Sequence, residues 1–406
     1  MNRVCYQINL QQGFGGGEIY TRFFSHALQQ LGWQVTLFVH KNAGFWRKLD
    51  MPGVTLVPVG SYEEIHAHLP VERSLFITHS PAIGRLADTL ASKHVLAGFA
   101  HMPLYNRNPA PFRPYHLVFA VSGHVIDSLR AAGIDSYYEA PLYGVADLTR
   151  PTMGQTTAIR AASVYDWDTR KVRDRLLSHL YPPLFALRPA RYFEKREGLT
   201  LGVVSRLTPI KQFPLMFGIL APVIRQFPDV NLEIFGSGGY ASVRDLRKSL
   251  HPVAGQVRWW GHQNSLTAVY PQLDFLITGL PEKEALGLNV IEAQACGTPV
   301  LAVHAPPFTE TVLEAETGYF FTDPRQDNGR DFARLLGNLH AAEGKFPDPR
   351  RATAHLERFS LAQFSQRVER AMNAAIRLLP LRQNSCRLNR TLTWGGDKGR
   401  KWQDTV

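Results

Sequence analysis

The sequence has few cysteines and no long apolar run, and both absences limit what the protein can be. Its 406 residues include three cysteines, Cys5, Cys296 and Cys386, which are far apart and odd in number. This argues against a disulfide framework or a cysteine metal cluster and favours a reducing compartment. No stretch reaches about 18 consecutive apolar residues, so no membrane-spanning helix is predicted. Polar residues break the apolar run of the N-terminal segment, unlike a secretory signal, so we expect a cytoplasmic protein.

The sequence also has fewer acidic than basic residues. The chain has 45 Lys and Arg against 34 Asp and Glu, a formal net charge of +11. The excess gathers in residues 151–198 and 381–406, neither of which has the pattern of a nucleic-acid module, so we expect no nucleic-acid partner. Contact with an anionic membrane surface remains as an interpretation, with plain solvated charge as the alternative.

The length of the chain exceeds what one hydrophobic core usually holds, so two domains are expected. Strand-like apolar runs alternate with helical periods in both halves, which predicts two doubly wound α/β domains with parallel sheets. The predicted strands are 3–10, 35–39, 54–58, 75–78, 95–99, 117–121, 199–204, 232–235, 256–260, 273–278 and 318–321. Ligands of such domains bind beyond the carboxyl ends of the strands, so the loops there are the candidate site.

Two glycine-rich loops follow predicted strands. Gly13 to Gly17 lie at the start of a predicted helix, where free amides suit a phosphate, although a tight turn is the alternative. A dinucleotide fingerprint fails here, because Glu18 stands where its third glycine is required. The run Gly236 to Ala241 satisfies that fingerprint, but no carboxylate follows the next strand to hold a ribose, so NAD is not predicted.

The stretch 281–300 contains two glutamates eight positions apart, Glu284 and Glu292. Its second half predicts a short helix over 289–295, which places Glu284 in the preceding loop. Within one helix the two carboxylates would point roughly 80° apart, so a shared ligand is easier to hold if one comes from the loop. Gly287 allows a ligand to approach the backbone, and a helix N-terminus binds anions. The combination fits a sugar attached to a phosphate.

This stretch resembles the signature of the retaining, family-four nucleotide-sugar glycosyltransferases: Glu, seven residues, Glu, with a glycine inside and Ala-x-Ala-x-Gly-x-Pro-Val following. The segment from Ser205 to Lys211 is similar to the family's Gly/Ser-Arg-Leu-x-x-x-Lys, and Gly16-Gly17 to the glycine pair that opens its first helix. Leu286 departs from the pattern, since the family often has an aromatic residue there. The resemblance covers about residues 1–378.

The resemblance implies the GT-B fold, in which two doubly wound Rossmann-like domains face each other and a C-terminal helix, here capped by Ser360, crosses back to the first. The expected division is an acceptor-binding domain over 1–165, a basic inserted helix and linker over 166–197, a nucleotide-sugar-binding domain over 198–358, the crossover helix over 359–379 and a basic tail over 380–406.

The resemblance also implies roles for individual residues. His101, chosen over His79 and His124, would lie near the transferred sugar, Glu284 would position its hydroxyls, and Arg206 and Lys211 would clamp the diphosphate; these four are the predicted catalytic residues. The predicted donor-binding residues are Gly16, Gly17, Gly236, Gly238, Gly287, Leu288, Asn289 and Glu292, the last of them on the ribose. Because cations and amides meet the leaving charge, neither a metal nor a cofactor is expected.

The expected activity is transfer of a hexose-type sugar from a nucleoside-diphosphate donor to a saccharide or lipid-linked saccharide. Synthesis of surface polysaccharide or lipopolysaccharide, in the cytoplasm or at the inner face of the cytoplasmic membrane, is the expected setting. Two alternatives stay open: a nucleotide-sugar epimerase of the same fold, and a protein that binds sugar nucleotides without turning them over.

The triplet Asp166-Trp-Asp168 offers another pair of carboxylates. It resembles the metal-binding motif of the other large glycosyltransferase fold, but it follows no clear strand end. We therefore favour a helix N-cap at Asp168, before an inserted helix predicted near 170–180.

Overall fold

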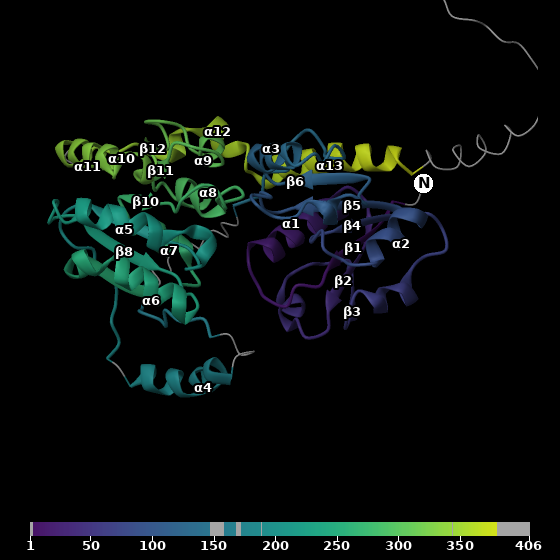
Figure 1. The fold of residues 1–406 in the computed structure, drawn as a ribbon, viewed down its shortest axis with the longest axis horizontal. Helices are drawn as coiled ribbons and strands as arrows, with labels where there is room; N and C mark the ends of the chain where they lie inside the picture. Colours follow the sequence, from purple (N-terminus) through teal and green to yellow (C-terminus); the bar gives the residue numbers. More distant parts are fainter. Residues whose placement is uncertain (1–2, 147–157, 168–171, 188, 343, 380–406) are drawn as a thin grey trace, which may run out of the picture.

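The computed structural model describes residues 3–146, 158–167, 172–187, 189–342 and 344–379. Figure 1 shows two α/β units, each a twisted sheet with helices on both faces. Both sheets have six strands, and all of their strand pairs are parallel. This confirms the predicted fold class. The boundaries given above for the domains and the linker stay a prediction.

The first sheet has the order β3-β2-β1-β4-β5-β6. Its strands are β1 (Val4–Asn9), β2 (Gln34–His40), β3 (Val54–Val59), β4 (Leu75–Thr78), β5 (Val95–Ala100) and β6 (Leu117–Ala120). The helices of this part are α1 (Gly16–Gln30), α2 (Leu86–Lys93) and α3 (Gly123–Ala131), with short 3-10 turns η1 (Gly44–Lys48), η2 (Glu63–His68) and η3 (Ala110–Phe112). The order reverses between β1 and β4, where a doubly wound sheet forms its binding crevice.

The second sheet has the order β12-β11-β10-β7-β8-β9, which is the same topology with its reversal between β7 and β10. Its strands are β7 (Thr200–Val204), β8 (Asn231–Phe235), β9 (Val257–Gly261), β10 (Phe275–Ile277), β11 (Val300–Val303) and β12 (Gly318–Phe321). The helices around it are α5 (Phe213–Ile224), α6 (Tyr240–Ser249), α7 (Leu266–Val269), α8 (Leu288–Ala295), α9 (Phe308–Thr311), α10 (Pro324–Asp327), α11 (Arg330–Ala341) and α12 (Thr353–Glu357), with 3-10 turns η4 (Pro209–Lys211), η5 (His251–Gln256), η6 (Tyr270–Gln272) and η7 (Pro349–Arg351).

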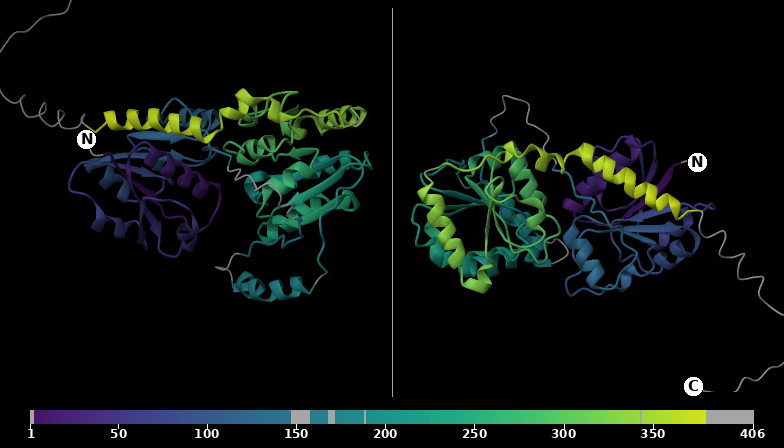
Figure 2. Two further views of the ribbon diagram at one scale, coloured as in Figure 1. Left: turned by 180° about the vertical axis from the view of Figure 1, so that it is seen from behind. Right: turned by 90° about the horizontal axis from the view of Figure 1, so that it is seen from above.

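The last described helix, α13 (Leu361–Arg377), crosses from the second unit back to the first, as predicted (Figure 2). The Ser360 hydroxyl caps it by accepting a hydrogen bond from the Gln363 amide. A stripe at helical spacing is buried in the core of the first unit: Phe364, Val368, Ala371, Met372 and Ala375. Because this stripe completes the first core, the two units share one folded structure although each has its own sheet.

The inserted helix α4 (Val172–Ala186) lies outside the layers of both units (Figures 1 and 2). The predicted end of this helix at residue 180 is wrong. A proline cannot donate an amide hydrogen bond and its ring crowds the preceding turn, yet the helix continues through Pro182 and Pro183 to Ala186, and the Leu187 amide donates to the Pro183 carbonyl at 3.2 Å. Asp168, the predicted cap, and the predicted tail 380–406 lie outside the described residues. Within the described residues, no helix has the length and apolar character needed to cross a membrane.

Candidate functional site

The loops that follow β1, β7 and β10 bring most of the predicted site residues to the two sheet reversals. The N-terminus of α1 meets the second unit there, because Arg206 Nη1 donates to the Phe14 carbonyl at 3.4 Å. A Cβ built on Gly16 would lie 3.7 Å from Leu288 Cδ1 at the start of α8. The structure therefore places Gly16, Arg206 and Leu288, which come from both units, next to one another.

Lys211 and Glu284 form an ion pair at the centre of this region. Lys211 Nζ donates to Glu284 Oε2, and both side chains are mostly buried. The Leu280 amide donates to the Lys211 carbonyl at 3.2 Å, which ties the loop after β7 to the loop after β10. Lys211 and Glu284, which the sequence analysis predicts as site residues, are 73 positions apart in the sequence and thus lie in direct contact.

Glu292 occupies a different environment from Glu284. It lies on α8, which begins one residue earlier than predicted because Gly287 adopts a left-handed conformation with φ +84° at the N-cap. Glu292 Oε2 accepts a hydrogen bond from the Tyr270 hydroxyl at 3.1 Å, and burial followed by the Glu292 charge raises the pKa of Tyr270. Asn289 Nδ2 donates to the Val204 carbonyl at 3.1 Å, which fixes the start of α8 against the end of β7.

Gly236 and Gly238 support the backbone that bears Arg206. A Cβ on Gly236 would lie 1.9 Å from the Ser205 carbonyl oxygen, and one on Gly238 would lie 2.2 Å from that of Leu207. No side chain fits at such distances. These two glycines therefore have a packing role, whether or not they also bind a donor.

His101 follows β5 in the first unit and belongs to a chain of hydrogen bonds. Its Nε2 lies 3.4 Å from His79 Nδ1, and His79 Nε2 lies 2.8 Å from Gln7 Oε1. Since the Gln7 oxygen only accepts, His79 donates from Nε2 and accepts from His101 at Nδ1. Burial lowers the pKa of both rings, that of His101 to about 4. Near neutral pH, His101 is therefore a neutral imidazole with its lone pair on Nδ1.

Tyr20 links His101 to the contact between the units. The two rings meet edge to face, with centroids 4.9 Å apart. On the other side, a Cβ on Gly144 would lie 3.4 Å from the Tyr20 ring and 2.9 Å from Leu288 Cδ2. The Tyr20 ring thus lies between His101 and the region around Leu288 at the start of α8. His124, in contrast, lies at the start of α3, where its amide donates to Glu310.

Glu310 is a residue that the sequence did not indicate. Its carboxylate accepts from the amides of Gly123 and His124 at 2.8 and 2.7 Å and from the Tyr143 hydroxyl at 2.9 Å. Glu310 belongs to α9 of the second unit, whereas its three donors belong to the first. Because the first amides of a helix have no partner within it, this carboxylate satisfies the N-terminus of α3 across the interface.

A second unexpected contact involves Asp166 from the predicted metal triplet. Its Oδ2 lies 3.6 Å from Arg206 Nη2, and both side chains are exposed. Among the residues that the structure describes, no three His, Cys, Asp or Glu side chains are grouped as metal ligands. Asp166 thus contacts Arg206, one of the two cations of the predicted diphosphate clamp, rather than another carboxylate among the described residues.

Comparison with known proteins bears on the identity of this site. Residues 189–338 match the model of the family described as Glycosyl transferases group 1. Over these residues the chain is similar to the group 1 glycosyltransferases. All the site residues predicted in the second unit lie within the matched segment, among them Arg206, Lys211, Glu284 and Glu292.

A curated relative agrees with this assignment over part of its length. The D-inositol 3-phosphate glycosyltransferase of Segniliparus rotundus is 30% identical over 191 residues, which cover 45% of this chain and 42% of that enzyme. The match therefore spans less than half of either protein.

Solved structures share the fold over nearly the whole chain. Anabaena HepE, solved in complex with UDP and glucose, superposes with a TM-score of 0.66 at 16% identity and covers 92% of this chain and 100% of its own. Sucrose-phosphate synthase from Thermosynechococcus elongatus gives a TM-score of 0.67 at 15% identity, with 93% and 100% covered. The chain thus has the GT-B fold, and the segment that matches the group 1 model lies in its second unit.

The contact of Glu310 with α3 yields a first prediction. Since a hydrogen bond to a charged group contributes on the order of 1.5–3 kcal/mol, Glu310→Ala should speed amide exchange in a peptide spanning Gly123 and His124 by at least about tenfold. Hydrogen exchange read by mass spectrometry measures this. Glu316→Ala, an exposed glutamate on the same unit, is the control, and equal exchange in both variants would contradict the assigned contact.

The histidine pair yields a second prediction. Burial holds the pKa of His101 at about 4 in the folded protein, below the ordinary value of about 6.5. The unfolded chain therefore binds the proton first, and stability present above about pH 6.5 is lost as the pH falls toward 4. Urea unfolding of His101→Gln should show a weaker loss between pH 7 and pH 5 than the wild type. Exposed His262→Gln should behave like the wild type, and a wild-type slope in His101→Gln would refute the account.

Proposed function

We propose that the protein is a retaining, metal-independent glycosyltransferase that moves a hexose-type sugar from a nucleoside-diphosphate donor to a saccharide or lipid-linked saccharide. The observation that carries the proposal is the Lys211–Glu284 ion pair, which joins the loops after β7 and β10 at the reversal of the second sheet. Two cations, a carboxylate and the N-terminus of α8 meet there, which suits a diphosphate joined to a polyhydroxyl ring. Anabaena HepE, solved with UDP and glucose, supports this class of donor.

The reaction breaks the bond between the anomeric carbon and the diphosphate oxygen, joins an acceptor oxygen to that carbon, and releases the nucleoside diphosphate and a proton. Negative charge develops on the departing diphosphate, so stabilising it is the main electrostatic task. Arg206 and Lys211, with amides near Gly16 and Gly287, perform that task in the proposal. Retention of configuration is part of the family resemblance.

The ion pair also suggests how Lys211 and Glu284 take part in donor binding. The Lys211 charge is matched by Glu284 in the structure. An incoming diphosphate competes for Lys211 as a stronger anion, which releases the Glu284 carboxylate to accept hydrogen bonds from sugar hydroxyls. Glu292, already fixed by the Tyr270 hydroxyl, takes the ribose.

The acceptor is assigned to the first unit, and His101 of that unit, held neutral by burial and bonded to His79, lies near the transferred sugar in the proposal. A neutral imidazole serves as a hydrogen-bond partner for sugar hydroxyls near neutral pH. Synthesis of surface polysaccharide or lipopolysaccharide at the inner face of the membrane is the proposed setting, and the basic excess of the chain supports it. An epimerase would isomerise the donor without an acceptor, and a binding protein would leave it unchanged.

A turnover experiment tests the proposal. Labelled nucleotide sugars are incubated with the protein, with and without a membrane extract. Wild type should transfer sugar only when the extract supplies an acceptor, whereas Arg206→Ala and Lys211→Ala should lose at least about 10²-fold in turnover, the usual cost of one charge-stabilising group.

Arg225→Ala and Lys248→Ala are the matched controls, since both side chains are exposed on the same domain away from the β7 and β10 loops. They should retain full turnover, and activity should survive EDTA. Wild-type turnover in the Arg206 and Lys211 variants would refute the diphosphate clamp. Isomerised donor without acceptor would establish the epimerase instead.

A further inference from the structure

Large exposed apolar side chains gather on and near the inserted helix α4. In the described part of the chain ten such side chains are exposed, and half of them lie within residues 172–192. Val172, Leu176 and Leu180 are 74%, 62% and 50% exposed, and Leu187 follows at 82%. The spacing of four residues places Val172, Leu176 and Leu180 along one face of the helix, and Leu187 follows directly after its last residue. The opposite face contains Asp174, which is buried, and Tyr181, which is half-buried.

The inner face anchors α4 to the rest of the protein. The Tyr181 ring meets those of Tyr165 and Trp167 edge to face, with centroids 5.5 and 5.6 Å apart. Tyr165 stacks on Tyr240 at 6.0 Å, and Asp166, between the two aromatic residues, pairs with Arg206. The apolar face of α4 is therefore held in a fixed relation to the candidate site, yet it lies outside both hydrophobic cores.

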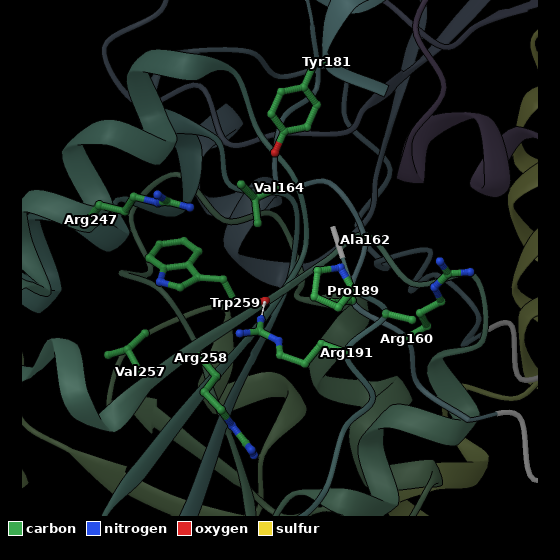
Figure 3. Close-up of a pocket in the computed structure, with 12 residues that line it drawn as sticks. Arg160, Ala162, Val164, Tyr181, Pro189, Arg191, Arg247, Val257, Arg258 and Trp259 are labelled. Carbon is green, nitrogen blue, oxygen red and sulfur yellow. Dashed lines mark hydrogen bonds between the residues drawn. The ribbon is translucent and has the colours of Figure 1, made fainter. Parts of the chain in front are cut away.

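A basic pocket lies beside this helix. It has a volume of about 440 Å³ and is lined by Tyr181 of α4, by Trp259 and by four arginines, with no Asp or Glu in its lining. Figure 3 shows Arg160 and Arg247 on opposite sides, with Arg191 between them bonded to the Trp259 carbonyl. Arg258 pairs with buried Glu233, whereas the structure describes no carboxylate partner for Arg160 or Arg247.

The sequence around α4 adds to this positive charge. Residues 170–191 contain six Lys and Arg and one acidic residue, Asp174. A second copy of the chain would meet this face with the same excess of positive charge, which disfavours self-association through it. A nucleic acid would satisfy the arginines but would leave the leucines in water. An anionic lipid surface satisfies both, because headgroup phosphates attract the cations and the acyl boundary accepts the apolar side chains.

We propose that the apolar face of α4 is a docking surface for an anionic phospholipid bilayer, and that the arginines of the adjoining pocket, on the Tyr181 side of the helix, add electrostatic attraction. Val172, Leu176, Leu180 and Leu187 enter the boundary between headgroups and acyl chains, and Arg160 and Arg247 contribute to the attraction for lipid phosphates. The anchoring of α4 through Tyr181 then holds the candidate site at a fixed orientation to the membrane. If the proposed function holds, this orientation serves an acceptor that resides in the bilayer.

Co-sedimentation of the full chain with vesicles tests the proposal without donor or acceptor. Wild type should bind vesicles of phosphatidylcholine with about 30% phosphatidylglycerol and leave pure phosphatidylcholine unbound. The double variant Leu176→Glu, Leu180→Glu should bind at least about tenfold more weakly, because two apolar side chains no longer enter the bilayer. Arg160→Ser with Arg247→Ser should weaken binding by a similar factor and reduce its dependence on salt.

Two matched controls test for non-specific effects. Val71→Glu changes a fully exposed apolar residue of the first unit, and Arg330→Ser changes an exposed arginine of the second; both should bind as wild type. Circular dichroism spectra that match the wild type show that the leucine and arginine double variants fold.

Several results would overturn the proposal: wild-type binding by either the leucine or the arginine double variant, equal binding to neutral vesicles, or a wild-type dimer in sedimentation velocity that the leucine substitutions dissociate. Binding to an oligonucleotide that depends on the arginines and not on the leucines would assign the surface to nucleic acid instead. Vesicle binding needs no nucleotide, so it is measured independently of catalysis. A wild-type protein that binds anionic vesicles but transfers no sugar would count against the proposed function and leave the docking surface intact.

Discussion

The arrangement of the two sheets depends on a few contacts that hold their carboxyl ends toward each other. Each sheet has its own core, so the site between them exists only while the units stay in register. Glu310 of the second unit satisfies the first amides of α3 in the first, and the Ser122 hydroxyl donates to the Ala285 carbonyl in the loop after β10. Together with α13, these contacts place the loop that contains Glu284 beside the first unit.

Charge balance accounts for the pairing of Lys211 with Glu284. Lys211 and Glu284 are both mostly buried, and a buried ion without a partner is expensive. Each neutralises the other, and removal of either side chain would leave an unpaired charge. Arg206 is exposed and has Asp166 and the Phe14 carbonyl as partners, so it retains the freedom to turn toward a ligand. The site thus combines a rigid pair with a cation that can still rearrange.

Sequence periodicity predicted the sheets well because buried parallel strands are short apolar runs between turn residues. Residues 75–78 and 318–321 coincide with β4 and β12. The inserted helix extends beyond its predicted end at residue 180, because it tolerates Pro182 and Pro183 within its last turns. The bridge from Glu310 to α3, the Asp166–Arg206 pair and the hydrogen bonds from Gln7 to His101 join distant positions, so no local pattern contains them. The roles assigned to individual site residues stay predictions, although the structure brings Lys211 and Glu284 together.

The most direct test of the account separates Glu284 from Glu292 by calorimetry with a bare nucleoside diphosphate. Glu292→Gln removes a charged partner of the ribose and should weaken binding by more than about tenfold, equivalent to 1.5–3 kcal/mol. Glu284→Gln frees Lys211 for the diphosphate and should leave binding unchanged or tighter, while weakening the intact donor relative to the bare nucleotide. Equal and negligible losses in both variants would contradict the account and show that the two carboxylates lie outside the donor site.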